Sequence, residues 1–92
     1  MIRSFQHKGL RQFHENGCTR GIQADHAKRL ARQLQFMDHA VAPADLDIPG
    51  WRLHPLKGEL DQYWSLTVNA NWRMVFRFVD SDIELVNYVD YH

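Results

Sequence analysis

The fold of this chain is decided by the stretch Tyr63-Trp64-Ser65-Leu66-Thr67-Val68-Asn69-Ala70-Asn71-Trp72-Arg73-Met74-Val75-Phe76-Arg77-Phe78-Val79. In residues 63–68 and 72–79, the side chains on one face are apolar and those on the other are mostly polar, a pattern with period two. Both runs are rich in aromatic and β-branched residues, as half-buried strands are. A three-residue loop, Asn69-Ala70-Asn71, predicts an antiparallel hairpin whose apolar face pairs Val68 with Trp72, Leu66 with Met74 and Trp64 with Phe76. The opposite face is mostly polar and includes Arg73 and Arg77.

A further strand is predicted after the turn Asp80-Ser81, over residues 82–89. A two-residue turn extends the apolar face with the pairs Phe78–Ile83, Phe76–Leu85 and Trp72–Val89. The same register sets Arg77 opposite Glu84 and Arg73 opposite Tyr88, with Asp90 and His92 at that end of the polar face. Arg77 therefore has a predicted carboxylate partner, whereas Arg73 has none directly across the strand.

Two amphipathic helices are predicted ahead of the hairpin. Residues 8–15 are followed by the stop signal Asn16-Gly17. Residues 24–40 carry an apolar stripe at helical spacing, made of Ala24, Ala27, Leu30, Ala31, Leu34 and Met37. Short strands are expected over residues 1–5 and 51–54, the second ended by Pro55. The predicted fold is α+β, a single domain over residues 1–92 with two N-terminal helices packed on a mostly antiparallel sheet of four to five strands.

Composition restricts the classes of protein to which the chain can belong. Its 92 residues are 45% hydrophobic, enough for one modest core. The single cysteine, Cys18, excludes an internal disulfide and favours a reducing compartment. No apolar run approaches the roughly 20 residues of a membrane span, and no leader pattern opens the chain. We expect a cytoplasmic protein without a membrane partner.

Charge is balanced overall but uneven along the chain. The formal net charge is zero, which argues against strong non-specific binding of nucleic acid. Most basic residues precede residue 58, namely Arg3, Lys8, Arg11, Arg20, Lys28, Arg29, Arg32, Arg52 and Lys57. A local basic side can still hold phosphate when the total charge cancels. An ordinary solvated helix face is an equally good interpretation of the residues before Arg52.

The histidines do not predict a metal site. His7, His14, His26, His39, His54 and His92 form no H-x-x-H or H-E-x-x-H pair, and no cysteine pair accompanies them. Cys18 lies in a loop with nothing nearby that would activate it as a nucleophile. We expect neither a metal nor another cofactor.

One group of polar residues suits RNA chemistry. The predicted strands bring toward one end of the sheet His54, Lys57, Arg73, Asp90, Tyr91 and His92. Metal-independent cleavage of an RNA phosphodiester needs a base for the 2′-hydroxyl, an acid for the leaving 5′-oxygen and cations for the phosphoryl charge. Histidine supplies the first two functions near neutral pH, and Lys57 and Arg73 supply the third. On residue types alone, a solvated surface is the more common explanation.

Several separated motifs give the chain a family resemblance. They are Leu53-His54-Pro55-Leu56-Lys57-Gly58, Tyr63-Trp64-Ser65-Leu66, Asn71-Trp72-Arg73 and the ending Asn87-Tyr88-Val89-Asp90-Tyr91-His92. In this order they closely resemble the HigB toxins of the RelE superfamily, which belong to bacterial toxin–antitoxin systems. The likeness is strong over residues 51–92 and looser over residues 16–50.

The resemblance implies a ribosome-dependent mRNA endonuclease of the bacterial cytoplasm. Such toxins cut the codon exposed in the ribosomal A site and leave a 2′,3′-cyclic phosphate. The partners implied are a HigA-like helix-turn-helix antitoxin, the ribosome and mRNA, with operator DNA reached only through the antitoxin complex. Carried over by motif, the catalytic residues are His54, Asp90, Tyr91 and His92, and the phosphate-binding residues are Lys57 and Arg73.

Two other functions stay open on the sequence. A non-catalytic module that binds RNA or a protein partner predicts that the C-terminal residues are dispensable. A metal-assisted hydrolase that uses the histidines predicts that a chelator abolishes activity.

Overall fold

A four-stranded antiparallel sheet forms the C-terminal half of the protein, with its strands adjacent in chain order. The computed structural model describes residues 1–58 and 62–91. The elements are α1 (Lys8–Asn16), the 3-10 helix η1 (Ala24–His26), α2 (Ala27–His39), the 3-10 helix η2 (Pro43–Leu46), β1 (His54–Pro55), β2 (Tyr63–Asn69), β3 (Trp72–Val79) and β4 (Asp82–Asp90). The predicted α+β architecture, two helices on an antiparallel sheet, is confirmed.

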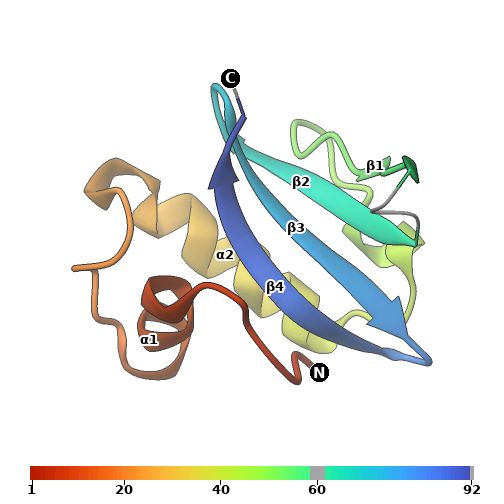
Figure 1. Ribbon diagram of the computed structural model, residues 1–92, viewed down its shortest axis with the longest axis horizontal. Helices are drawn as coiled ribbons and strands as arrows, with labels where there is room; N and C mark the ends of the chain where they lie inside the picture. Colours follow the sequence, from red (N-terminus) through yellow and green to blue (C-terminus); the bar gives the residue numbers. More distant parts are fainter. Residues whose placement is uncertain (59–61, 92) are drawn as a thin grey trace.

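The helices cover one face of the sheet. Figure 1 shows α2 crossing behind the strands, with α1 beside the edge formed by β4. The core is made by Leu10 of α1, by Leu30, Leu34 and Met37 of α2, and by the inward side chains of the sheet, Leu66, Val68, Met74, Phe76, Ile83, Val86 and Tyr88. Within residues 1–58 and 62–91, no helix covers the opposite face of the sheet (Figure 1). Side chains of β2 and β3 on that face, among them Thr67 and Arg73, line the candidate site described below.

The buried side of α2 differs from the predicted stripe. Leu30, Leu34 and Met37 are buried as expected, but Ala24 and Ala31 are exposed. Gln33 is fully buried instead, and its Nε2 donates a hydrogen bond of 2.9 Å to the backbone oxygen of Thr67. An amide at this position supplies a partner to a carbonyl of β2 at the point where that strand becomes irregular.

The hairpin of β2 and β3 follows the predicted register along most of its length. Trp64 pairs with Phe76 and Leu66 with Met74, as predicted. The prediction that Val68 faces Trp72 is wrong, because the register shifts after Thr67 and Asn69 pairs with Trp72. The loop is therefore Ala70-Asn71, and Ala70 adopts the left-handed conformation with φ 48°.

The pairing of β3 with β4 changes register at a β-bulge. Arg77 pairs with Glu84 and Phe78 with Ile83, as predicted. Leu85 then adopts φ 58°, and the register moves by one residue between Val75 and Arg77. One extra residue in β4 is the usual basis of such a bulge. The predicted pairs Trp72–Val89 and Arg73–Tyr88 are therefore wrong, because Trp72 pairs with Asp90 and Arg73 with Val89. The predicted pair Phe76–Leu85 falls at the bulge itself, where the register shifts.

After the bulge, each residue of β4 lies on the face of the sheet opposite to the one that the regular register predicts, because a one-residue shift in register moves every side chain to the other face. Tyr88 pairs with Met74 and is buried in the core, whereas Val89 pairs with Arg73 on the outer face. Asp90 pairs with Trp72. Tyr91 follows on the outer face, beside Arg73.

Two short segments complete the sheet edges. Ile2 and Phe5 form isolated parallel bridges with Ile83 and Val86, so the N-terminal segment lies along β4. At the other edge β1 is His54–Pro55 rather than the predicted strand over residues 51–54. The positive φ angles of Gly50 and Arg52, 91° and 52°, bend the backbone before His54 and prevent an extended strand there.

Helix α1 begins with a histidine cap. The Nδ1 atom of His7 accepts a hydrogen bond of 2.9 Å from the backbone N–H of Leu10, and the His7 ring packs edge-on against Tyr88. Burial lowers the pKa of His7. The cap requires an unprotonated Nδ1, because a protonated imidazole has no acceptor.

We expect the folded state to lose stability as the pH falls from about 7.5 to about 5.5. The His7 pKa is lower in the folded protein than its value of about 6.5 in an unfolded chain. At a pH between the folded and the unfolded pKa of His7, the unfolded chain binds more protons than the folded protein. Lowering the pH through this range therefore favours unfolding. Urea unfolding of the parent and of His7→Asn at both pH values measures this, because asparagine caps a helix without titrating. Equal pH dependence in the two proteins would contradict the assignment.

Candidate active site

A cavity of about 340 Å³ opens on the face of the sheet opposite the helices. Its lining residues come from the β1 region, from β2 and β3, and from the chain after β4, and they are Arg52, Leu53, His54, Leu56, Ser65, Thr67, Arg73 and Tyr91. The structure thus brings together three of the six predicted site residues, His54, Arg73 and Tyr91. They contribute an imidazole, a guanidinium and a phenol to one cavity.

Backbone contacts position these three residues. His54 is held by pairing with Ser65 of β2. The backbone N–H of Tyr91 donates a 2.8 Å hydrogen bond to the carbonyl of Asn71, which ties the end of the chain to the β2–β3 loop. Arg73 donates from Nη1 to the carbonyls of Ala70 and Trp72, at 2.7 and 3.2 Å. Both bonds use Nη1. Nε and Nη2 make no hydrogen bond or ion pair with another residue of the ranges 1–58 and 62–91, so they are available to an anion.

The histidines differ in how they are used. The rings of His7, His26 and His39 are hydrogen-bonded to the Leu10 N–H, the Tyr88 hydroxyl and the Gln35 carbonyl, and His14 packs on Phe5. Across residues 1–58 and 62–91, His54 is the one histidine with no such contact, and it is exposed. Its ring is therefore available to a substrate. His92 lies outside the described residues.

Two other predicted site residues, Lys57 and Asp90, are not among the lining residues of this cavity. Lys57 is exposed in the loop after β1, three residues beyond His54. Asp90 is exposed at the end of β4, opposite Trp72 and not on the polar face that the regular register predicted. The bulge at Leu85 is the physical reason for this difference.

Arg52 is a lining residue that the sequence did not single out for the site. It is exposed, it lines the cavity together with His54 and Arg73, and its φ is 52°. A positive φ is uncommon for a residue other than glycine and often marks a functional position. Pro49-Gly50 is a dipeptide typical of turns, but the sequence does not indicate where the Arg52 side chain lies.

An aromatic cluster supports the site from the core side of the sheet. The rings of Trp72 and Tyr88 stack with their centroids 4.5 Å apart. The Tyr88 hydroxyl lies 2.5 Å from Nδ1 of buried His26 and accepts a hydrogen bond of 3.4 Å from the Gln23 N–H. Burial raises the pKa of Tyr88, so its hydroxyl stays protonated. The cluster holds the ends of β3 and β4, from which Arg73 and Tyr91 reach the opposite face.

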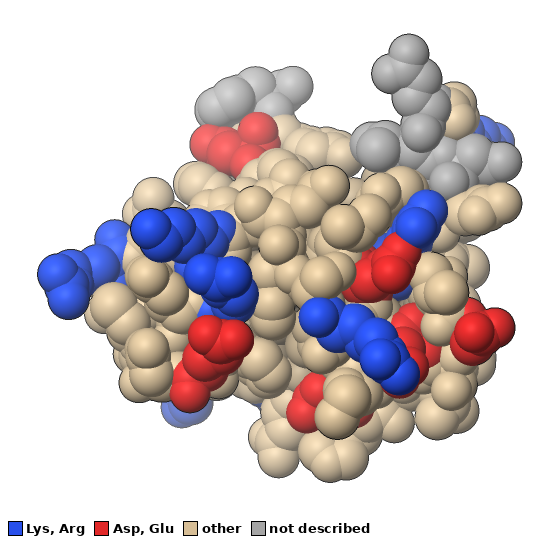
Figure 2. Space-filling view, turned by 60° about the horizontal axis from the view of Figure 1, so that its bottom comes forward, with Lys and Arg blue, Asp and Glu red and all other residues tan. Residues whose placement is uncertain are grey.

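Many charged side chains outside the site make local contacts. Arg3 pairs with Asp82 at 2.7 Å, and Arg77 pairs with Glu84 as predicted. Figure 2 shows one face on which basic and acidic side chains are interspersed among uncharged ones. The predicted basic side is not a continuous patch on the face drawn there.

The described residues offer no ready metal site and no membrane span. Across residues 1–58 and 62–91, no three His, Cys, Asp or Glu side chains are grouped as ligands for a metal ion. Within the same ranges, no helix has the length and apolar character needed to cross a bilayer.

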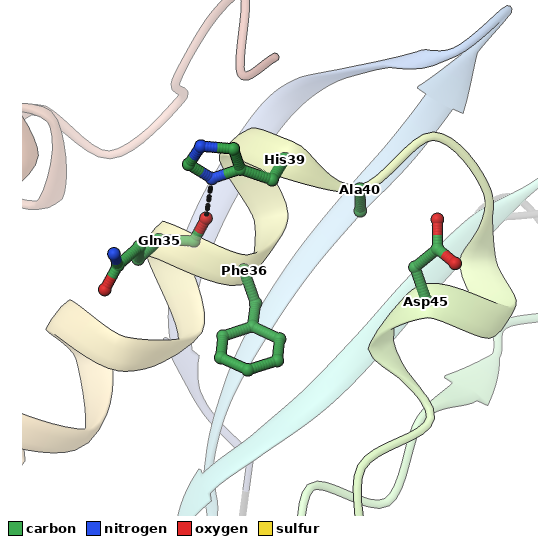
Figure 3. A pocket seen from close by; sticks show the side chains of 5 residues that line it. All are labelled: Gln35, Phe36, His39, Ala40 and Asp45. Carbon is green, nitrogen blue, oxygen red and sulfur yellow. Dashed lines mark hydrogen bonds between the residues drawn. The ribbon is translucent and has the colours of Figure 1, made fainter.

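A second cavity of about 340 Å³ lies at the C-terminal end of α2 (Figure 3). It is lined by Gln35, Phe36, His39, Ala40 and Asp45. The His39 ring is hydrogen-bonded to the Gln35 carbonyl, and the Asp45 carboxylate accepts from the N–H groups of Val41 and Ala42. Because both ionisable groups already stabilise local backbone, this cavity is a weaker candidate for chemistry than the one beside His54.

Known proteins resemble the chain in both sequence and fold. Residues 3–92 match the family model for the RelE-like toxin of the type II toxin–antitoxin system HigB. The chain is 46% identical over 92 residues to Endoribonuclease HigB of Proteus vulgaris, covering all of both chains. It is 37% identical over 94 residues to Toxin HigB-1 of Vibrio cholerae serotype O1, covering 100% of this chain and 98% of that protein.

Solved structures agree on the fold. The YoeB–YefM complex from Staphylococcus aureus aligns with TM-score 0.61 at 19% identity, covering 100% of this chain and 98% of that chain. A YafQ mutant from E. coli aligns with TM-score 0.62 at 16% identity, covering 98% and 91%. These structures and the family match confirm the predicted RelE-like fold and the predicted family. The chain belongs to the HigB-like family of RelE-like toxins.

Proposed function

We propose that this protein is an endoribonuclease that cuts mRNA in the ribosomal A site without a metal in the chemical step. The observation that carries the proposal is the exposed His54 ring, free of protein partners among the described residues, in one cavity with Arg73 and Tyr91. Family membership and the name of the Proteus relative, Endoribonuclease HigB, support the same activity.

The proposed reaction is internal transfer at one phosphodiester. The ribose 2′-hydroxyl loses its proton to a base and attacks phosphorus, and the 5′-oxygen leaves with a proton from an acid. The products are a 2′,3′-cyclic phosphate and a 5′-hydroxyl. Arg73 binds the phosphoryl oxygens through its free nitrogens, where negative charge develops. His54 moves one of the two protons.

The other residues complete the proposed site. Tyr91 orients the nucleotide at the wall that it contributes to the cavity. Lys57 and Arg52 add positive charge toward the phosphate backbone. Asp90 and His92 are proposed as further catalytic groups on their position at the chain end, as the family resemblance implies.

The proposed partners follow from the family. The Staphylococcus structure is a YoeB–YefM complex, and the family model describes toxin–antitoxin systems. We propose that a HigA-like helix-turn-helix antitoxin neutralises this chain in the bacterial cytoplasm, and that operator DNA is bound only through that complex. A balanced net charge fits an enzyme that acts on mRNA presented by the ribosome rather than on free RNA.

The test is controlled expression without antitoxin, with mapping of mRNA 5′ ends while translation is running or blocked. We expect growth arrest and new 5′ ends only on translated messages. His54→Gln is the control that keeps the fold and removes the proposed proton-transfer group. Rapid cutting of naked RNA at physiological salt would overturn ribosome dependence, and growth arrest without RNA cutting would favour a binding module.

Cleavage is expected to need no transition metal. The proposed groups are His, Lys, Arg, Asp and Tyr side chains, which carry out acid–base and electrostatic catalysis unaided. Chelators disassemble ribosomes, so the measurement is metal analysis of the pure protein together with single-turnover cutting at a fixed magnesium concentration. A stoichiometric bound transition metal that turnover requires would contradict this expectation.

A further inference from the structure

A third cavity, of about 250 Å³, lies next to the candidate active site on the same outer face of the sheet. It is lined by Gln6, Tyr63, Val75, Asn87, Val89 and Tyr91. Tyr91 also lines the cavity that holds His54 and Arg73. The two cavities therefore share a wall, and a ligand bound in one is adjacent to a ligand bound in the other.

The two cavities differ in chemistry. The first presents the cationic side chains Arg52 and Arg73 beside His54. The third cavity has no charged side chain among the described residues that line it, and it combines two phenol rings, two aliphatic side chains and two amides. A phosphate requires the first kind of surface. A flat aromatic heterocycle with polar edges matches the second, because apolar walls contact its faces and amides bind its edge.

Local contacts preorganise the third cavity. The Arg77 guanidinium lies 6.0 Å from the centroid of the Tyr63 ring and is itself paired with Glu84, which holds that ring in place. The Asn87 Oδ1 accepts a 2.9 Å hydrogen bond from the Tyr88 N–H, so its NH₂ group is left as a donor. Every nucleobase has an acceptor on its edge that such a donor can bind.

We propose that this cavity is a nucleobase-binding subsite for the RNA nucleotide next to the cleaved bond. The proposal rests on the proposed function, because it takes the neighbouring cavity as the phosphate site. Tyr63 and Tyr91 contact the base faces, and Asn87 binds its edge. The bulge at Leu85 is what places Asn87, Val89 and Tyr91 together on this face of the sheet.

The test measures cleavage of mRNA on programmed ribosomes and free in solution, with each nucleotide around the cut replaced in turn by an abasic one. The variants are Tyr63→Leu, which removes an aromatic wall, and Tyr63→Phe, which keeps it. Val89→Phe fills the cavity, and Val79→Phe is its control on an exposed part of the sheet away from it. Thermal melting of each variant reports folding.

We expect one abasic position to lower kcat/KM of the parent about tenfold or more, the usual effect of losing a stacked base. Tyr63→Leu and Val89→Phe should lower it comparably on intact RNA, with Tyr63→Phe and Val79→Phe near the parent value. The decisive result is that the two effects on kcat/KM are not additive: the abasic nucleotide should not lower kcat/KM of the Tyr63→Leu and Val89→Phe proteins any further.

The other outcomes separate the two proposals. If the parent protein cuts intact RNA but the abasic nucleotide and the substitutions lower kcat/KM independently of each other, the subsite is overturned. The proposed function is unaffected by that result. A parent that cuts no RNA in either form overturns both. Variants that cut normally but bind the antitoxin more weakly would make this cavity a protein-docking site instead.

Discussion

Replacing His54 by glutamine is expected to abolish RNA cleavage while leaving the protein folded. His54 is exposed and lines the cavity with Arg73 and Tyr91, and its ring makes no hydrogen bond or ring contact within the described ranges. Its removal therefore costs the fold little. General acid–base catalysis by one positioned group contributes about 10²–10⁴-fold, so single-turnover rates should fall by that factor.

His39→Gln is the matched control for this experiment. His39 is also exposed, but its ring is bonded to the Gln35 carbonyl of its own helix, outside the proposed site. This variant should cut RNA at the parent rate. Retention of more than about a tenth of parent activity in His54→Gln would remove His54 from the catalytic set.

Arg73→Ala is expected to slow cleavage far more than Arg77→Ala. Both side chains lie on the outer face of β3, with Val75 between them on the same face. Arg73 lines the cavity, and its Nε and Nη2 make no bond to any other described residue, whereas Arg77 pairs with Glu84 and lies beside Tyr63. Losing a donor to developing transition-state charge typically costs about 10²–10³-fold in rate. We expect a loss of that size for Arg73→Ala at saturating substrate.

Arg77→Ala should act mainly on stability. The Arg77–Glu84 pair is partly exposed, and such pairs contribute about 0–1 kcal/mol to the free energy of unfolding. Its rate should stay within a few-fold of the parent value, the residual loss arising from a less fixed Tyr63 ring. Single-turnover rates and urea midpoints of the two variants test the contrast. Equal rates would show that Arg73 is not a transition-state contact.

The sequence predicted the fold well wherever local pattern determines it. The apolar alternation of β2 and β3 gave the pairs Trp64–Phe76 and Leu66–Met74, and the stop signal at Gly17 gave the end of α1. Period and turn chemistry are enough for such features, because they depend on residues close together in the chain. The fold class followed from the order of these elements.

The positions of the last residues could not be predicted, because a bulge has no reliable sequence signature. Leu85 has a positive φ although it is neither glycine nor asparagine, the residues that most often adopt one. Its apolar side chain also fits the period-two pattern of a regular strand, so the sequence does not reveal the bulge. The regular register therefore assigned Val89 to the core and Tyr88 to the surface, the reverse of their actual faces.

The candidate site was predicted in part, for a similar reason. Residue types and motifs singled out His54, Arg73 and Tyr91, which the structure places around one cavity. Arg52 was missed because its position depends on a backbone turn with φ 52°, and not on a pattern of side chains. The third cavity was missed because its residues are spread along the chain from Gln6 to Tyr91.

The extra residue at Leu85 also limits which changes in length β4 can accept. From Val86 onward, the side chains that fill the core and those that face the cavity alternate one by one. Deleting a single residue there would move Tyr88 out of the core and Tyr91 away from His54, although every residue type was retained. Inserting or deleting two residues would preserve both assignments. Natural length variation in this strand should therefore come in even steps, and an odd step should need a compensating bulge elsewhere in the strand.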